Sequence, residues 1–124
     1  MKRSLPFFLL LLLAACGPSG VSVYDRDDIR VGEVEVESAD RATIYDRDEI
    51  TLGKVRENDI YDRDDRRIGR VRADNNIEDK DGTRVGRLRD GKRCVDRDDN
   101  TVGRINETID AQAAGGACLL LLIR

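Results

Sequence analysis

The sequence predicts an all-β protein with one C-terminal helix, in which five β-hairpin repeats close into a shallow, ten-stranded, pseudo-symmetric barrel with the hydrophobic helix in its lumen. Three observations predict this fold. A phrase such as IYDRDDRRIGRVR, at residues 60–72, recurs five times, three apolar positions recur in every copy, and the chain ends in an aliphatic run.

Residues 1–15 have the form of a secretory signal peptide. Two basic residues precede an apolar run that is shorter than the roughly 20 residues a membrane-spanning helix needs. The motif LAACG, which ends at Gly17, resembles the bacterial lipobox. It implies cleavage before Cys16 and acylation of its thiol, with palmitate among the chains; an ordinary signal cleavage beside a chance cysteine is the alternative. We expect residues 16–22 to be a lipidated N-terminus and short linker.

A lipid anchor predicts a location in the cell envelope, on the outer membrane or on the periplasmic face of the inner membrane. Removal of residues 1–15 leaves 20 basic and 25 acidic residues, a net charge of −5. This balance argues against a nucleic-acid partner, because phosphate binding needs a clustered excess of Lys and Arg. The remaining 109 of the 124 residues suffice for one domain.

Residues 23–106 are predicted to form the five hairpins of the barrel. Each copy has a β-prone start, a polar turn and a second β-prone segment, which is the pattern of a hairpin. Turn residues also separate the copies. The copies align on five glycines spaced by 21, 16, 17 and 17 residues: Gly32, Gly53, Gly69, Gly86 and Gly103. A unit this short cannot bury a face alone, so neighbouring copies must pack together.

Three apolar positions in each copy are the candidate core. The first is Val23, Ile44, Ile60, Ile77 and Cys94; the second is Val31, Leu52, Ile68, Val85 and Val102; the third is Val34, Val55, Val71, Leu88 and Ile105. The second and third positions are three residues apart, so strict alternation would put them on opposite faces. A bulge or bend at the intervening glycine would turn both inward.

Residues 107–124 are predicted to form a hydrophobic helix that plugs the barrel. Its aliphatic end would cover every face of a helix, so the helix must be surrounded, and it is too short to span a bilayer. Asn106 or Thr108 could cap the start, with Asp110 in the first turn. A break at Gly115-Gly116 followed by a short strand is the alternative.

The lipobox, the five Y-D-x-D-x-x-x-[IVL]-G-x-[VIL] hairpins and the aliphatic tail together resemble the five-fold beta-flower lipoprotein family, shallow barrels related in shape to the tubby C-terminal domain. The likeness covers nearly the whole mature chain. Glu78 and Val95 replace the tyrosine of the motif, and four additional residues separate the first two hairpins. The resemblance implies a fold and an envelope location, and no established activity.

Cys94 and Cys118 are the two thiols left after acylation of Cys16. An oxidising compartment favours a disulfide between them, which would tie the lumen helix to the fifth hairpin. Two buried free thiols that act as small apolar side chains are the alternative.

A calcium site is the weakest of the binding hypotheses. Asp96, Asp98 and Asn100 alternate, and Glu107 follows Asp96 by eleven residues, as in an EF-hand loop. Thr101 replaces the loop glycine, and the flanking helices are missing. The simpler interpretation is that the aspartates cap the turns, while the cation inside each turn neutralises acids of neighbouring repeats.

A basic sector, formed by Arg70, Arg72, Arg87 and Arg89, is the candidate patch for an anionic ligand, opposite an acidic strand with Glu33, Glu35 and Glu37. Tubby-like domains bind phosphoinositides, so the resemblance implies a lipid or glycan headgroup as ligand. A solvated, charged wall is the alternative.

The predicted function is that of a non-enzymatic envelope lipoprotein, a structural or protein-interaction module whose partners are the membrane, through its anchor, and an envelope protein. The chain has no histidine for proton transfer near neutral pH. We expect no cofactor. A module that binds anionic headgroups or calcium on the membrane surface is the second hypothesis.

Overall fold

The computed structural model describes residues 20–123. The predicted signal peptide and the lipidation site Cys16 lie outside these residues. In the described range, no helix has both the length and the apolar character that crossing a bilayer requires.

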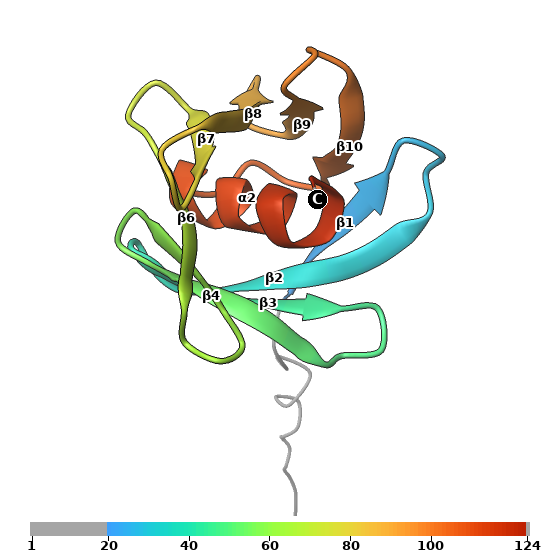
Figure 1. Cartoon of the computed structure of the whole chain (residues 1–124). Helices are drawn as coiled ribbons and strands as arrows, with labels where there is room; N and C mark the ends of the chain where they lie inside the picture. The colour runs from blue at the N-terminus through green and yellow to red at the C-terminus, as the bar shows by residue number, and fades with distance from the viewer. Residues whose placement is uncertain (1–19, 124) are drawn as a thin grey trace, which may run out of the picture.

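Ten antiparallel strands form one closed barrel, in which each strand pairs with its neighbours in sequence and β1 pairs with β10 (Figure 1). This confirms the predicted fold class and the five hairpins. The strands are β1 (Val21–Asp25), β2 (Arg30–Ser38), β3 (Arg41–Asp46), β4 (Thr51–Arg56), β5 (Asp59–Asp62), β6 (Arg67–Val71), β7 (Asn76–Asp79), β8 (Arg84–Arg89), β9 (Arg93–Asp96) and β10 (Thr101–Ile105).

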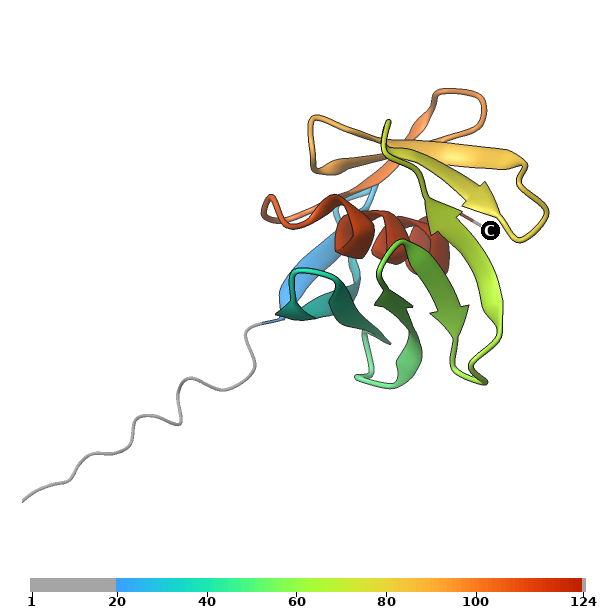
Figure 2. The ribbon, with the colours of Figure 1, turned by 90° about the vertical axis from the view of Figure 1, so that its left-hand side faces the viewer.

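The two ends of the barrel differ in what they carry. We call the mouth the end that holds the five hairpin turns, at residues 26–29, 47–50, 63–66, 80–83 and 97–100, and the base the end where successive hairpins are joined. β1 starts at the base, and the last described residue, Ile123, lies at the mouth. Figure 2 shows the start of β1 and the C-terminus on opposite sides of the barrel.

The barrel begins earlier than the sequence predicted. β1 starts at Val21, inside the segment assigned to the linker (residues 16–22), because Val21 is buried and pairs with Val34. The four additional residues between the first two hairpins lengthen β2 and β3 at the base rather than the turn that joins them, and the barrel closes regardless.

Every hairpin contains a bulge, as predicted, but the extra residue is the second apolar position rather than the glycine that follows it, because the glycine stays paired. In the first hairpin, Val23 pairs with Gly32 and Tyr24 pairs with Arg30, so Val31 is the extra residue. Equivalent register shifts occur in the other four hairpins. The bulge lets a residue that alternation would point outward lean toward the lumen. The glycine faces the lumen as well, because it pairs with the buried first position.

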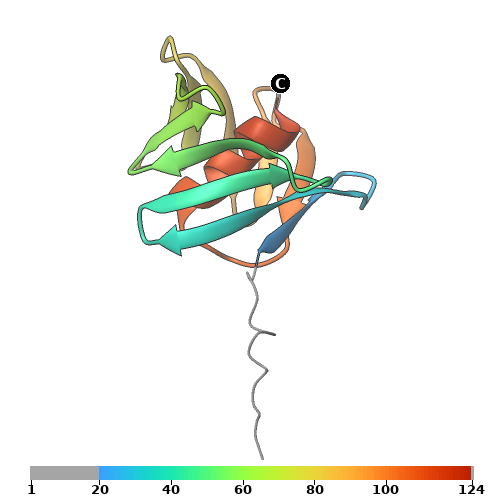
Figure 3. The same cartoon turned by 90° about the horizontal axis from the view of Figure 1, so that it is seen from below.

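A twelve-residue helix occupies the lumen, as predicted (Figure 3). It consists of an α-helix, α2 (Ala111–Ala117), and a π-helical turn, η1 (Cys118–Leu122). The helix starts four residues later than the predicted segment 107–124. Asp110 is the N-cap residue and makes no side-chain capping bond, so neither Asn106 nor Thr108 caps the helix. The helix continues through Gly115-Gly116, so the predicted alternative of a break there is wrong. The absence of side chains at these two positions lets the helix pack closely against Val71 and Val55 of the barrel wall.

The last five aliphatic residues each face a different hairpin glycine. A Cβ atom on any of these glycines would lie 2.6–3.0 Å from a methyl of the facing residue. The facing pairs are Leu119 with Gly69, Leu120 with Gly53, Leu121 with Gly32, Leu122 with Gly103 and Ile123 with Gly86. Successive residues therefore step around the ring by one hairpin at a time.

The π-helical turn explains how five consecutive residues meet five repeats. An α-helix advances about 100° per residue, whereas a ring of five needs about 72°. A π-helix, with its i→i+5 hydrogen bonds, has more residues per turn, so its rotation per residue is closer to the 72° between neighbouring hairpins. One such bond runs from the Ile123 N–H to the Cys118 carbonyl, at 2.8 Å. The tail thus matches the symmetry of the wall.

Candidate functional site

The five turns at the mouth share one hydrogen-bond pattern, which fixes the first aspartate of each DRD phrase. In the first turn, Asp25 Oδ1 accepts the backbone N–H groups of Asp27 and Ile29, at 2.9 and 3.0 Å. Asp46, Asp62, Asp79 and Asp96 accept the corresponding pairs of N–H groups in the other turns. The repeated aspartate therefore caps its own turn, as the simpler interpretation predicted.

The third residue of each of the five turns has a left-handed backbone. These residues are Asp28, Glu49, Asp65, Gly82 and Asp99, with φ between 66° and 83°. Four of the five are acidic rather than glycine, although this conformation is costly for most side chains. Three of the four carboxylates meet a cation of the preceding hairpin in the ring.

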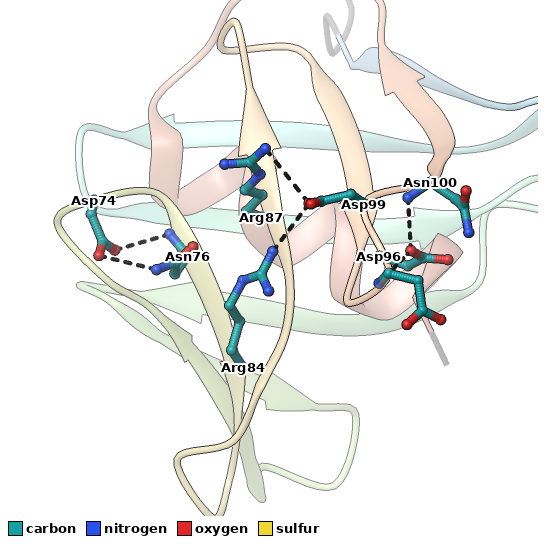
Figure 4. Close-up of polar contacts among 8 residues, drawn as sticks. Asp74, Asn76, Arg84, Arg87, Asp96, Asp99 and Asn100 are labelled. Carbon is teal, nitrogen blue, oxygen red and sulfur yellow. Dashed lines mark hydrogen bonds and ion pairs between the residues drawn. The ribbon is translucent and has the colours of Figure 1, made fainter.

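The ion pairs of those three acids link neighbouring repeats. Lys54 Nζ lies 2.8 Å from Asp65 Oδ1, and Arg104 Nη2 lies 2.7 Å from Asp28 Oδ1. Asp99 Oδ1 lies between Arg84 and Arg87, at 3.4 and 3.6 Å (Figure 4). The hydrogen bond and the charge of Lys54 lower the pKa of Asp65; desolvation opposes them, and the charge of Arg56 adds to the lowering.

The cations that neutralise the turns are not the ones the sequence indicated. Within residues 20–123, the cations inside the turns, namely Arg26, Arg47, Arg63, Lys80 and Arg97, make no ion pair. The pairing cations come from the strands instead, because strand side chains beside the turns reach the left-handed residue of the next hairpin.

A depression opens between the turns at the mouth. Its volume is about 730 Å³, and it is lined by turn residues of the first, fourth and fifth hairpins, such as Asp25, Asp79 and Asp96. A second depression of about 370 Å³ lies beside the third hairpin, at Asp62 and Ile68. Both have residues of the segment 119–123 as their floor. Sequence reasoning treated that segment only as core, yet Leu121 and Leu122 remain half-buried.

The EF-hand-like set is not assembled. Asp96 uses Oδ1 to accept the N–H groups of Asp98 and Asn100 at the mouth (Figure 4). Glu107 follows β10, which runs from the mouth to the base, so strand β10 separates it from the other three residues. Among residues 20–123, no group of three or more His, Cys, Asp or Glu is placed to hold a metal ion. The proposed calcium ligands therefore do not converge.

The four arginines of the candidate anionic patch do not form one open surface. Glu78 on β7 pairs in register with Arg70 and lies 3.6 Å from Arg72 Nε. Arg87 is engaged by Asp99. Arg70 and Arg89 are exposed and make no ion pair within the described chain. From the sequence, the four arginines were expected to form one basic surface. In the barrel, β7 lies between β6 and β8, and its Glu78 separates the two pairs of arginines.

The acidic side of the wall is organised around Tyr45. Its hydroxyl donates a hydrogen bond to Glu35 Oε1, at 3.0 Å. This hydrogen bond is the main cause that raises the pKa of Tyr45 above 10.0; partial burial and the charges of Glu35, Glu37 and Glu33 act in the same direction. Arg56, on β4 of the same hairpin, places its guanidinium 4.6 Å from the ring centroid of Tyr61 on the next hairpin.

Where the motif lacks its tyrosine, the wall changes locally. Glu78 pairs with Arg72, as described above. Val95 is fully buried although its register points it outward, between Arg87 and Thr101 on the adjacent strands. The stem of a long side chain such as Arg87 can cover an apolar neighbour in this way.

A disulfide joins Cys94 on β9 to Cys118, the first residue of η1. Both residues are fully buried, and their Cα atoms are 5.5 Å apart. Since 24 residues separate them, the bond closes a loop that contains β10 and α2. It fixes the segment that forms the floor of the mouth.

Comparison with known proteins identifies the repeat architecture. Residues 21–116 match the model of the 5-fold beta-flower protein family. No curated protein and no solved structure matches the chain.

Proposed function

Because the chain belongs to the 5-fold beta-flower family, we propose that it is a non-enzymatic lipoprotein of a bacterial envelope, anchored through Cys16, that acts as a protein-interaction module. The inward positions are used for packing around the lumen helix, and the aspartates of the turns hold the turns. The chain has no histidine for general acid-base catalysis. The loops at the two ends and the charged outer wall remain available to other molecules.

One observation carries the proposal: the mouth lies at the end of the barrel opposite the start of β1. Cys16 precedes Val21 by five residues, which span at most about 17 Å when extended. An acylated Cys16 would hold the base within that reach of the bilayer, and the mouth would face the aqueous compartment. Loops presented in this way by a rigid scaffold commonly carry binding function.

Photo-crosslinking in intact cells tests this function. A photoreactive residue replaces Lys80, which is exposed in a turn at the mouth, and in a matched control replaces Asp74, which is exposed at the base. We expect one recurrent protein adduct from position 80 and not from position 74. Adducts from position 74 alone, or no protein adduct from either position, would overturn the proposal.

The anchor needs a separate test, because a soluble module could also give adducts. Fractionation should find the full chain with the membranes and its Cys16→Ser variant outside them. Metabolic labelling with a palmitate analogue should mark the first protein and not the second. Equal membrane association of the two proteins would contradict an anchor at Cys16.

A second function, contact with anionic lipid or glycan headgroups, is favoured by Arg70 and Arg89, which are exposed and unpaired in the described chain. Arg89 ends β8 at the base, the end nearer to the predicted anchor. Binding to vesicles with and without phosphatidylglycerol tests this role. An Arg70→Ser and Arg89→Ser double variant should lose the preference for the anionic vesicles, and an unchanged preference would reject the role.

A further inference from the structure

We propose that the mouth of the barrel binds a cationic, apolar peptide segment of an envelope protein partner. The aliphatic stems of its Lys or Arg side chains would lie on the apolar floor, and their charged ends would meet the carboxylates of Asp25, Asp79 and Asp96. This inference rests on the proposed function, because it names the chemistry of the partner for the same surface.

The floor of the larger depression is apolar although the depression is open to solvent. Leu121, Leu122 and Ile123 form the floor, and Val31, Val85 and Val102 stand around it. Leu121 and Leu122 remain half-buried, although both methyls of each lie against a hairpin glycine. The depression thus combines an apolar floor with a polar, charged rim, and binding sites commonly join apolar surface to convergent polar groups.

Three carboxylates around this floor are held in place before any ligand arrives. Oδ1 of each accepts two backbone N–H groups of its own turn. Within residues 20–123, Oδ2 of Asp25, Asp79 and Asp96 has no hydrogen bond or ion pair. Each therefore offers a fixed, unused acceptor, and a cation that meets it avoids the cost of ordering the side chain.

The charge around the depression favours a cationic partner. Five carboxylates, those of Asp27 and Asp98 included, line it, against two guanidinium groups, those of Arg26 and Arg97. These acids are too dispersed for three of them to share one metal ion in the described chain. Several cations on a peptide can meet dispersed carboxylates, which a single ion cannot do.

Lys and Arg side chains suit both features at once. Their methylene stems pack on apolar surface while the charged end stays at the polar rim. A carboxylate paired with a cation forms a stronger hydrogen bond than a neutral pair does. The depression thus selects a segment that combines apolar residues with Lys or Arg, rather than an acidic or a purely apolar one.

Calorimetry with the whole protein in phosphatidylcholine nanodiscs tests the inference. The probes are three peptides of equal length, made of Leu and Lys, of Leu and Glu, and of Ser and Lys. We expect binding of the Leu/Lys peptide, at least about tenfold weaker binding of the Ser/Lys peptide, and none of the Leu/Glu peptide. Equal affinity for the Leu/Glu peptide, or no binding of the Leu/Lys peptide, would overturn the proposal.

The variant Asp25→Asn, Asp79→Asn, Asp96→Asn removes the three charges and keeps an Oδ1 acceptor for each turn. It should weaken binding of the Leu/Lys peptide about tenfold or more, with an unchanged thermal midpoint. The matched control, Asp40→Asn, Asp74→Asn, Asp90→Asn, removes three charges from the loops of the base and should bind normally. Equal losses in both variants would mean that net charge alone attracts the peptide, and the site would be rejected.

Two further results separate the failure of this inference from that of the proposed function. If position 80 gives its protein adduct but the Leu/Lys peptide does not bind, the mouth is an interaction surface for a partner of other chemistry. If the peptide binds but no adduct forms in cells, the site exists and the proposed function fails. Val85→Thr and Val102→Thr, which make the wall polar with little change of shape, should weaken binding of the Leu/Lys peptide several-fold, and unchanged affinity would reject the apolar contact.

Discussion

Arg104 on β10 donates a hydrogen bond to Asp28 in the turn of the first hairpin, with 2.7 Å between Nη2 and Oδ1. The same guanidinium lies 4.5 Å from the centroid of the Tyr24 ring. These contacts cross the seam where β1 pairs with β10. Away from this seam, the ion pair of Lys54 with Asp65 joins the second and third hairpins in the same way, from a strand cation to the left-handed acid of the next turn. The closing seam is therefore held by the contact that joins other neighbouring hairpins.

The fourth turn lacks this contact, which leads to the first prediction. Gly82 stands where Asp65 and Asp99 stand in their turns, and Arg70 of the preceding hairpin makes no ion pair in the described chain. A Cβ on Gly82 would meet no atom within 4 Å. We expect Gly82→Asp to change the free energy of unfolding by less than about 1 kcal/mol, since a new exposed ion pair offsets the cost of the left-handed backbone.

A double-mutant cycle in urea with Arg70→Ala measures that ion pair. The coupling between Asp at position 82 and Arg70 should be about 0.2–1 kcal/mol and should shrink in high salt. A coupling of zero at low salt would show that the interhairpin pair is not reproduced.

The lumen glycines should not tolerate a methyl group. A Cβ on Gly69 would lie 2.8 Å from Leu119 Cδ2 and closer still to the carbonyl oxygen of Glu78. We expect Gly69→Ala to lower the free energy of unfolding by about 1–3 kcal/mol, because the backbone of β7 and the tail must shift. Urea unfolding followed by circular dichroism measures the loss. Ala73→Gly, at an exposed loop position on the base, serves as the control and should change little; equal stability of Gly69→Ala and the parent would contradict the close contact.

The disulfide should contribute measurably to stability. Cys94 and Cys118 close a loop of about 24 residues, for which the chain-entropy model gives about 3 kcal/mol. A reducing agent should therefore lower the midpoint of urea unfolding of the parent. It should have no effect on a Cys94→Ala, Cys118→Ala variant, which is the control. Two thiols that react with an alkylating agent in the unreduced, unfolded protein would show that the bond is absent.

Tyr45 should ionise at a higher pH than usual. The hydrogen bond to Glu35 and the surrounding acids favour the neutral phenol, so the pKa in the folded state lies above the ordinary 10.0. The resulting stabilisation is complete below pH 10 and is lost as the pH rises through the folded-state pKa. In a Tyr24→Phe, Tyr61→Phe background, phenolate absorbance should show that Glu35→Ala moves the pKa of Tyr45 back toward 10.0; an unmoved titration would exclude Glu35 as the cause.

The hairpins, the bulges and the lumen helix were predictable because each follows from a local pattern that is repeated. Spacing of three between Ile68 and Val71 required a bulge, and five consecutive aliphatic residues required an enclosed helix. The start of β1 was misplaced because Val21 precedes the repeated phrase, and its burial depends on pairing with Val34.

The candidate site was less accessible to sequence reasoning, since it depends on how the ring brings repeats together. Nothing in the local phrase shows that the acid of one turn meets a cation from the preceding hairpin, as Asp99 meets Arg87. Which tail residue faces which glycine, such as Leu121 with Gly32, depends on the π-helical conformation of the tail, which the sequence does not reveal. One signal was present in the sequence: the number of aliphatic residues in the run 119–123 equals the number of hairpins.

That one-to-one match ties the length of the tail to the number of hairpins. A ring of four or six units would leave a tail residue without its glycine or a glycine without its tail residue. A hairpin could therefore be added to the barrel or removed from it without loss of packing only if the tail gained or lost one residue as well.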